Sequence, residues 1–267
     1  GAINVRSAAP VVGDGLSGRV AASFEGDNGE YFEGHISGSV SENVAMRFSI
    51  MDRSIDGYLD NTAPTAAYTD SPTTDETIAR IGIQWEPSES TSVGVRYTYG
   101  DYERIGSNSV VTQLAPTFVD STGDGVRNQP FVPSSNLLMY GVMGLVYPGF
   151  QPTTSDDEVF YDGLSIGGTE SLDGGNGPER ISGTDTQNHE FSLNIEHEFA
   201  NGLTLTSVTG FSEYEYKDGI EADFLPVEFI GRSDDSKFDQ LSQEIRLASD
   251  LDQRFSWVVG GNFIESK

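Results

Sequence analysis

The chain contains few side chains that could do chemistry, and their spacing matches no catalytic or metal-binding pattern. Its three histidines, His35, His189 and His197, belong to no metal-ligand pattern of the His-Glu-x-x-His kind. Glu33 and His35 would share one face of a strand, but a solvated pair on a polar face is the simpler interpretation. Serines and aspartates are frequent, yet no nucleophile elbow or Ser/His/Asp order rises above chance. We therefore expect no enzyme, and we assign no catalytic, cofactor-binding or metal-binding residue.

Two kinds of loop segment could hold an ion or a phosphate group. Residues 163–168 and 174–177 are rich in glycine, but no helix follows them, so ordinary loop glycines are a simpler interpretation than a phosphate cradle. Residues 120–125 read Asp-Ser-Thr-Gly-Asp-Gly, and hard oxygen ligands beside glycine turns would suit calcium. The segment lacks the spacing and the terminal glutamate of an EF-hand, so a solvated acidic turn remains the alternative.

Composition narrows the classes of partner. The 267 residues include 15 Lys and Arg against 42 Asp and Glu, a net charge of −27 that disfavours nucleic-acid binding. The absence of cysteine excludes disulfides and thiolate metal sites. The longest mostly apolar run, Leu137–Tyr147, is far shorter than the roughly 20 residues that a membrane helix needs. Because the chain opens at Gly1 without a leader, we expect either a removed leader or an internal piece of a larger protein.

Hydrophobic residues recur with a period of two. The clearest segments are 44–51, 79–85, 93–100 and 190–199. In the last of these the apolar-face residues alternate strictly with polar ones; they are Phe191, Leu193, Ile195, His197 and Phe199. Successive side chains of a strand point to opposite faces, whereas a helix would scatter the polar residues around its circumference. We therefore predict strands and reject helices for these segments.

Weaker segments complete the strand pattern. They lie at residues 16–24, 32–40, 203–216, 238–248 and 255–263, and Gln243 interrupts the apolar face of one of them. The total is about nine strands of roughly 10 residues, which is typical of membrane barrels. A soluble β-sandwich also has one apolar and one polar face, so strand pattern alone leaves both readings open.

The lengths of the links favour the barrel. After the second strand, tight links at 41–43, 86–90, 200–202 and 250–253 alternate with long links at 52–76, 101–186 and 217–237. Alternate links of an up-and-down meander lie at opposite ends, so one end carries all the long loops. Outer-membrane barrels have this asymmetry, with short periplasmic turns and long extracellular loops.

Aromatic residues support the same interpretation. Trp85, Phe199, Phe255 and Trp257 all lie close to tight links, where the meander would gather them into a belt at the membrane interface. The alternative is that they are ordinary core aromatics near strand ends. His197 lies on the apolar face, but next to the tight-turn end, where a polar group costs only about 0–1 kcal/mol.

Short blocks in a fixed order carry a resemblance to a known family. They are Gly1–Val5, Ala45–Phe48 followed by Asp56-Gly57-Tyr58 and Asn61, Ala79-Arg80 with Trp85–Pro87, Leu203–Phe211, Gln243–Ser249 and Trp257–Gly261. Together these blocks resemble the TonB-dependent outer-membrane receptors. The opening Gly1–Val5 is similar to the last strand of that family's plug domain.

The resemblance implies an all-β, antiparallel up-and-down transmembrane β-barrel, of which the chain supplies about nine of about 22 strands. Residues 1–10 would be the end of the plug domain. Residues 11–267 would be the N-terminal part of the barrel, with extracellular loops at about 52–76, 101–186 and 217–237. The chain would then be an internal fragment without the rest of the plug, the Ton box or the remaining strands.

The function implied by the resemblance is active transport in the outer membrane of a Gram-negative bacterium. Such a receptor binds a scarce extracellular ligand (siderophore-iron, cobalamin or an oligosaccharide) and imports it to the periplasm. Its expected partners are outer-membrane lipid, that ligand and the TonB complex, which acts through the missing N-terminal region. The alternatives are a passive porin-like barrel and a soluble β-sandwich carbohydrate-binding module.

Ligand choice is expected in the longest link, residues 101–186. It mixes many carboxylates with aromatic residues that could stack on a ligand, namely Tyr102, Phe118, Phe131, Tyr140, Tyr147, Phe150, Phe160 and Tyr161. Loops on a rigid scaffold commonly carry recognition, and the carboxylates would favour cationic or metal-bearing ligands. The alternative is that the acidity only keeps the loop solvated.

Overall fold

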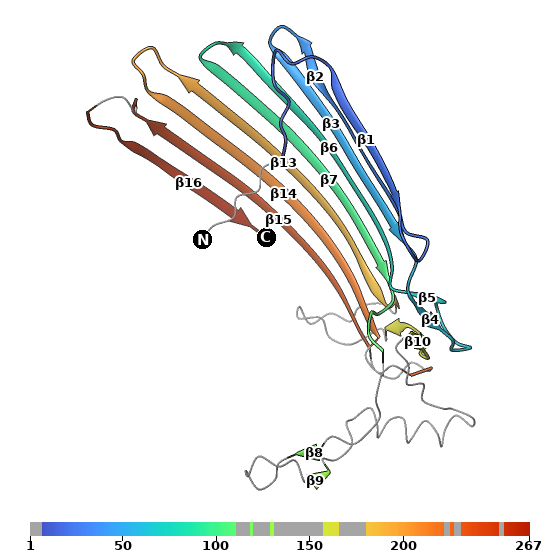
Figure 1. Ribbon diagram of the computed structural model, residues 1–267. Helices are drawn as coiled ribbons and strands as arrows, with labels where there is room; N and C mark the ends of the chain where they lie inside the picture. The colour runs from blue at the N-terminus through green and yellow to red at the C-terminus, as the bar shows by residue number, and fades with distance from the viewer. Residues whose placement is uncertain are drawn as a thin grey trace.

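One antiparallel sheet of nine strands forms most of the molecule (Figure 1). The computed structural model describes residues 7–110, 118–119, 129–130, 157–165, 180–221, 225–226, 231–250 and 254–267. The strands of the sheet, in spatial order, are β1 (Ser17–Phe24), β2 (Glu30–Ser41), β3 (Val44–Ile55), β6 (Thr73–Ser88), β7 (Thr91–Ile105), β13 (Gly183–Glu198), β14 (Thr204–Glu221), β15 (Gly231–Ala248) and β16 (Val258–Ser266). Spatial order follows chain order, so the predicted up-and-down meander is confirmed.

Short strands pair among the long links. β4 (Leu59–Asn61) lies between β5 (Asp70–Ser71) and β10 (Glu158–Val159) in a three-stranded sheet. Two further pairs are β8 (Phe118–Val119) with β9 (Gln129–Pro130) and β11 (Leu164–Ser165) with β12 (Arg180–Ile181). Within the described ranges, no helix is long and apolar enough to cross a bilayer.

One face of the large sheet is an uncovered apolar band. The register aligns five of its side chains across neighbouring strands, and all five are exposed: Phe48, Ile81, Tyr97, Phe191 and Phe211. Residues directly opposite one another in a sheet share a face. A β-sandwich would bury this row against a second sheet, and no such sheet covers it among the described residues. The sandwich alternative is therefore wrong for this part of the chain.

The aromatic residues at the tight-turn end are also exposed. Trp85, Phe199, Phe255 and Trp257 all keep more than a third of their surface accessible. The ring of His197 packs edge-on against Phe199, with their centroids 4.6 Å apart. These residues are not buried in a core, which is what an interfacial belt requires.

The strands extend beyond the predicted segments, so the three long links are shorter than predicted. They begin after Ile55, Ile105 and Glu221 rather than at residues 52, 101 and 217. Between the apolar band and the long links, both faces of the sheet are polar. The alternation of apolar and polar residues therefore stops there, although the strands remain paired. Thr77, for example, pairs with Asp52 and donates a hydrogen bond of 2.6 Å to its carboxylate.

Polar side chains on the apolar face bond to neighbouring strands. Thr209 donates to Gln243 Oε1 at 2.6 Å, and Gln243 Nε2 donates to Ser207 Oγ at 3.0 Å. Thr91 Oγ1 and His197 Nδ1 lie 2.8 Å apart, within hydrogen-bond distance. Because an unpaired polar group is costly in an apolar medium, these bonds explain how the face tolerates Gln243, which interrupts the alternation.

Both outer strands leave one edge unpaired. Among the described residues β1 pairs only with β2, and β16 pairs only with β15. An open edge presents a row of free amides and carbonyls, and each unsatisfied group costs several kcal/mol in lipid.

The 267-residue chain expressed alone is therefore expected not to insert as a stable barrel, because its two edges stay unpaired. Semi-native gel electrophoresis and protease digestion in detergent test this expectation. A heat-modifiable, protease-resistant monomer would contradict it.

Candidate functional site

Three arginines gather on the polar face of the sheet. Arg47 on β3 and Arg96 on β7 lie on the same row, and Gly82 of β6 stands between them without a side chain. Arg80 occupies the adjacent row of β6 on the same face. We call Arg47, Arg80 and Arg96 the arginine cluster.

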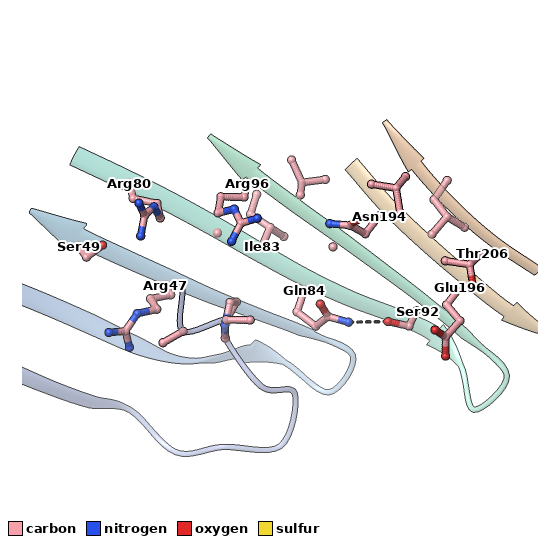
Figure 2. A pocket seen from close by; sticks show the side chains of 18 of the residues that line it. Arg47, Ser49, Arg80, Ile83, Gln84, Ser92, Arg96, Asn194, Glu196 and Thr206 are labelled. Atoms are coloured by element: carbon pink, nitrogen blue, oxygen red, sulfur yellow. Dashed lines mark hydrogen bonds between the residues drawn. The ribbon is translucent and has the colours of Figure 1, made fainter. Parts of the chain in front are cut away.

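The arginine cluster lines a hollow on the polar face (Figure 2). Its main cavity has a volume of about 410 Å³ and is lined by all three arginines and by Arg246, which forms an ion pair with Glu244. A second cavity of about 300 Å³ shares Arg47 and Arg80 with it, and a third of about 190 Å³ shares Arg96. The arginines therefore stand where neighbouring hollows of the polar face meet.

Each cavity beside the arginine cluster is also lined by a glutamate, namely Glu196, Glu33 and Glu190, but among the described residues none of these forms an ion pair with the arginine cluster. Arg80 Nε donates to Thr98 Oγ1 at 3.0 Å, and Arg96 Nη1 donates to Ser7 Oγ. Glu196 lines the main cavity (Figure 2), but among the described residues no carboxylate forms an ion pair with the arginine cluster. In a chain of net charge −27, such a cluster attracts a negative partner.

The N-terminal segment Ser7–Pro10 lies on this same face. Pro10 is buried, and a Cβ added to Gly82 would lie 3.3 Å from its Cδ atom. The following residues are anchored to β2, since Ser39 N donates to Asp14 O at 3.0 Å. A glycine at position 82 thus gives the segment room to approach the sheet beside Arg96.

Residues of the long links form a small hydrophobic core. Leu59, Val159 and Tyr161 are buried against one another, and Tyr68 packs against them. The rings of Tyr68 and Tyr161 meet edge-on, with their centroids 6.1 Å apart. We call these four residues the loop core. Asp162 N also donates to Leu225 O at 2.9 Å, which ties a third link to this unit.

Asn61 joins two links of the loop core. Its Nδ2 donates to Tyr161 O at 2.9 Å, and its Oδ1 accepts from Ala63 N at 3.3 Å. A Cβ added to Gly57 would lie only 2.0 Å from Ser71 N, so glycine is required there. Contacts among the links thus explain why glycine stands at position 57 and asparagine at position 61 of this sequence block.

The three histidines are not brought together. His35 lines the cavity of about 300 Å³, His189 Nδ1 lies 2.8 Å from Tyr97 OH, and His197 lies beside Thr91. The described residues contain no group of three side chains that could hold a metal ion.

Glu33 does not pair with His35. Its carboxylate lies 3.9 Å from Arg19 and accepts a hydrogen bond of 2.8 Å from Tyr31 OH. The glutamate is therefore part of the polar surface of β2, as the simpler interpretation of this pair predicted.

The structure describes four of the eight aromatic residues that were expected to meet a ligand. Tyr161 is only 2% exposed, so the expectation that its ring stacks on a ligand is wrong. Tyr102 belongs to β7, Phe118 to β8, and Phe160 is half-buried. The remaining predicted positions lie outside the described residues; they are Phe131, Tyr140, Tyr147, Phe150, the calcium candidate at 120–125 and the glycines at 174–177.

Sequence reasoning missed the arginine cluster, although the signal was present. All three arginines occupy polar positions of clear period-two segments. What was missing was the register between strands, which places Arg47 and Arg96 on one row. Counting back from the tight turn gives the register of β6 with β7, but a long link joins β3 to β6, so the register between Arg47 and Arg96 comes only from the structure.

Comparison with known proteins identifies the fold. No protein-family model and no curated protein sequence matches the chain. Several solved structures match the fold of this chain. One is the ferric-catecholate import receptor Fiu of E. coli K12 in its closed form (TM-score 0.61, 12% identity), and the match covers 97% of this chain. The ferric yersiniabactin uptake receptor FyuA of Yersinia pestis (TM-score 0.58, 10% identity) also covers 97%. The pyoverdine outer-membrane receptor FpvA of Pseudomonas aeruginosa PAO1 (TM-score 0.60, 17% identity) covers 96%.

The predicted fold class is confirmed by these matches. The chain has the fold of part of the barrel of TonB-dependent siderophore receptors, as the blocks of sequence indicated. It spans about a third of the length of the structures it matches, 32% of Fiu and 31% of FpvA.

Asn61→Ala is expected to loosen the loop core, because it leaves buried backbone groups without partners at a cost of about 1–3 kcal/mol. Hydrogen exchange of residues 56–72 in the full-length protein should accelerate, while exchange in β13 and β14 stays unchanged. Asn262→Ala, at an exposed position of β16, is the matched control. Equal exchange in both variants would contradict the role of Asn61.

Burial raises the pKa of the Tyr68 and Tyr161 hydroxyls above the ordinary value. An unfolded tyrosine ionises near about pH 10, so the stabilisation from the neutral pair is complete below that pH and is lost as the pH rises further. Alkaline titration followed by tyrosinate absorbance and limited proteolysis should open the loop core above about pH 10. Tyr161→Phe should move this opening to higher pH, and ionisation of both tyrosines with intact protease resistance would refute the coupling.

Proposed function

We propose that the chain is part of a TonB-dependent receptor in the outer membrane of a Gram-negative bacterium, which binds an extracellular iron–siderophore complex and imports it to the periplasm. The observation that carries this proposal is the barrel-type sheet, with an exposed apolar band on one face and a hollowed polar face on the other. Three structures that share this fold are receptors for ferric catecholate, ferric yersiniabactin and pyoverdine. Their ligands favour iron chelates over the cobalamin and oligosaccharide alternatives.

The proposal assigns each part of the fold a location relative to the outer membrane. The apolar band meets lipid, since its row of aromatic and aliphatic side chains is exposed. The tight turns face the periplasm, and the long links with the loop core face the outside of the cell. Residues 1–10 are the end of a plug domain, and the TonB complex acts on the region that precedes them.

The segment Ser7–Pro10 on the polar face supports a plugged receptor over a passive porin. A porin keeps its interior open as an aqueous channel. Here Ser7–Pro10 lies on the polar face, and Pro10 is buried there. The barrel supplies recognition and a conduit, while the energy for transport comes from the TonB complex.

Uptake by cells tests the proposal. Deletion of the parent gene should abolish growth with a ferric siderophore as the sole iron source, and the intact gene should restore it. Separate arms supply a ferric catecholate, ferric pyoverdine, cobalamin and a maltooligosaccharide. Radioactive iron uptake should stop when a protonophore collapses the energy supply. Uptake that continues with the protonophore would instead identify a passive porin.

A further inference from the structure

The apolar band ends in a boundary row on the side of the long links. The register aligns Tyr99 of β7 with His189 of β13 and Glu213 of β14, next to the exposed row that contains Tyr97 and Phe191. Because side chains two positions apart on a strand share a face, the boundary row lies on the same face as the apolar band. The outer-membrane orientation proposed above puts this row at the level of the lipid headgroups.

Five side chains form a connected group at this boundary. Tyr97 OH and His189 Nδ1 lie 2.8 Å apart, and the centroid of the His189 ring lies 6.2 Å from that of Tyr97 and 5.2 Å from that of Tyr99. Tyr99 OH donates to Asp101 Oδ2 at 2.5 Å, and Gln187 Nε2 donates to the same oxygen at 3.2 Å. We call these five residues the ring cluster. Their mutual contacts across two paired strands arrange the group before any ligand binds, which lowers the entropic cost of binding.

The ring cluster combines the chemical groups that bind sugars. A sugar ring has an apolar face of C–H groups and a rim of hydroxyls. The exposed aromatic ring of Tyr97 offers a surface to the C–H face. A carboxylate can accept about four hydrogen bonds, and the ring cluster itself supplies Asp101 with two of them. Asp101 therefore has acceptor capacity for a sugar hydroxyl beside the rings.

Charge around the ring cluster disfavours a phosphate headgroup. On the neighbouring strands, Lys237 lies 2.7 Å from the Glu215 carboxylate and 3.4 Å from that of Glu213, and Lys217 lies 3.7 Å from Asp185. Both lysines thus already contact carboxylates, and the acidic side chains around the cluster repel an anion. An uncharged saccharide avoids this repulsion and can still form hydrogen bonds with the ring cluster.

The position of the ring cluster favours a sugar that carries a lipid tail. The neighbouring row of the apolar band contains Phe191 and Phe211, which are exposed on the same face. A ligand with its sugar at the ring cluster would lay its tail over these two rings. A soluble sugar would leave them uncovered. Continuity of the ring cluster with the apolar band therefore favours a glycolipid over a free sugar as the occupant.

We propose that the ring cluster binds the uncharged saccharide headgroup of a glycolipid in the outer leaflet of the membrane, while the tails of this lipid lie along the apolar band. The inference rests on the proposed function, because a lipid meets this face only if the sheet is part of a membrane barrel. The glycolipid is a partner of the outer surface of the barrel and is not the imported ligand.

Lipid binding to the full-length protein tests the proposal. The protein is purified in a polyoxyethylene detergent, which has no sugar headgroup. Native mass spectrometry then measures the binding of monoglucosyl diacylglycerol and of phosphatidylglycerol with the same acyl chains. The glucosyl lipid should bind about tenfold more tightly, a ratio equivalent to about 1.4 kcal/mol. Equal affinities, or tighter binding of phosphatidylglycerol, would overturn the proposal.

Two tyrosines of β7 distinguish the ring cluster from the opposite face. Tyr99→Ala removes one ring of the cluster and should lower the affinity for the glucosyl lipid about tenfold. Tyr102→Ala is the matched control, since this tyrosine belongs to the same strand but to its polar face, and the affinity should stay unchanged. The same affinity in both variants would refute the role of the ring cluster.

A glucosyl lipid with a diazirine on its sugar locates the site in the unmutated protein, so the answer does not depend on whether a variant folds. After irradiation, the crosslinked peptides should contain residues 97–101 of β7 or 187–191 of β13. Crosslinks confined to other segments of the chain would contradict the proposal.

Two further arms identify other occupants. Free maltose that displaces the glucosyl lipid would mean that the site takes a soluble sugar, which overturns the proposal. Phosphatidylglycerol that outcompetes the glucosyl lipid only with Mg²⁺ present would identify a phosphate bridged by a cation, and this result overturns it too. All arms use protein without a siderophore, so their failure leaves the uptake experiment, and with it the proposed function, independently decided.

Discussion

The pairing register of the nine strands is the constraint on which the rest of the structure depends. Successive side chains of a strand alternate between faces, so a slip of one residue would exchange the apolar and polar faces of that strand. The register aligns Phe48, Ile81 and Tyr97 in one exposed apolar row. The same register places Arg47 and Arg96 on the opposite face, on one row. Backbone hydrogen bonds thus fix both surfaces at once.

The large sheet does not bury a core of its own, and the clearest apolar packing in the described chain lies among the links. Leu59, Val159 and Tyr161 come from segments about a hundred positions apart, and Asn61 bonds across that separation. The sheet provides the frame that brings these links together, because β3, β6, β7 and β13 are neighbours. The loop core in turn holds Leu59, Tyr68, Val159 and Tyr161 in a defined arrangement that link length alone does not provide.

Charge is distributed unevenly over the molecule. Carboxylates dominate the composition, yet the hollow of the polar face carries Arg47, Arg80 and Arg96 without carboxylate partners among the described residues. The longest link also contributes to packing, since Tyr161 is buried in the loop core. Positive and negative side chains share the polar face, since Glu196 lines the same cavity as the arginine cluster.

The sequence by itself determined the strands, their order and the two ends of the sheet, because period-two patterning and link length are local properties. It also determined the resemblance in fold, since short blocks such as Ala45–Phe48 keep their order along the chain. Only the tertiary structure decided which residues come into contact. It sets the register that places Arg47 and Arg96 on one row, and the hydrogen bonds of Gln243 to β14. It also buries Tyr161, whose carbonyl accepts a hydrogen bond from Asn61. Those outcomes depend on contacts between distant segments, and a local pattern of hydrophobicity carries no record of them.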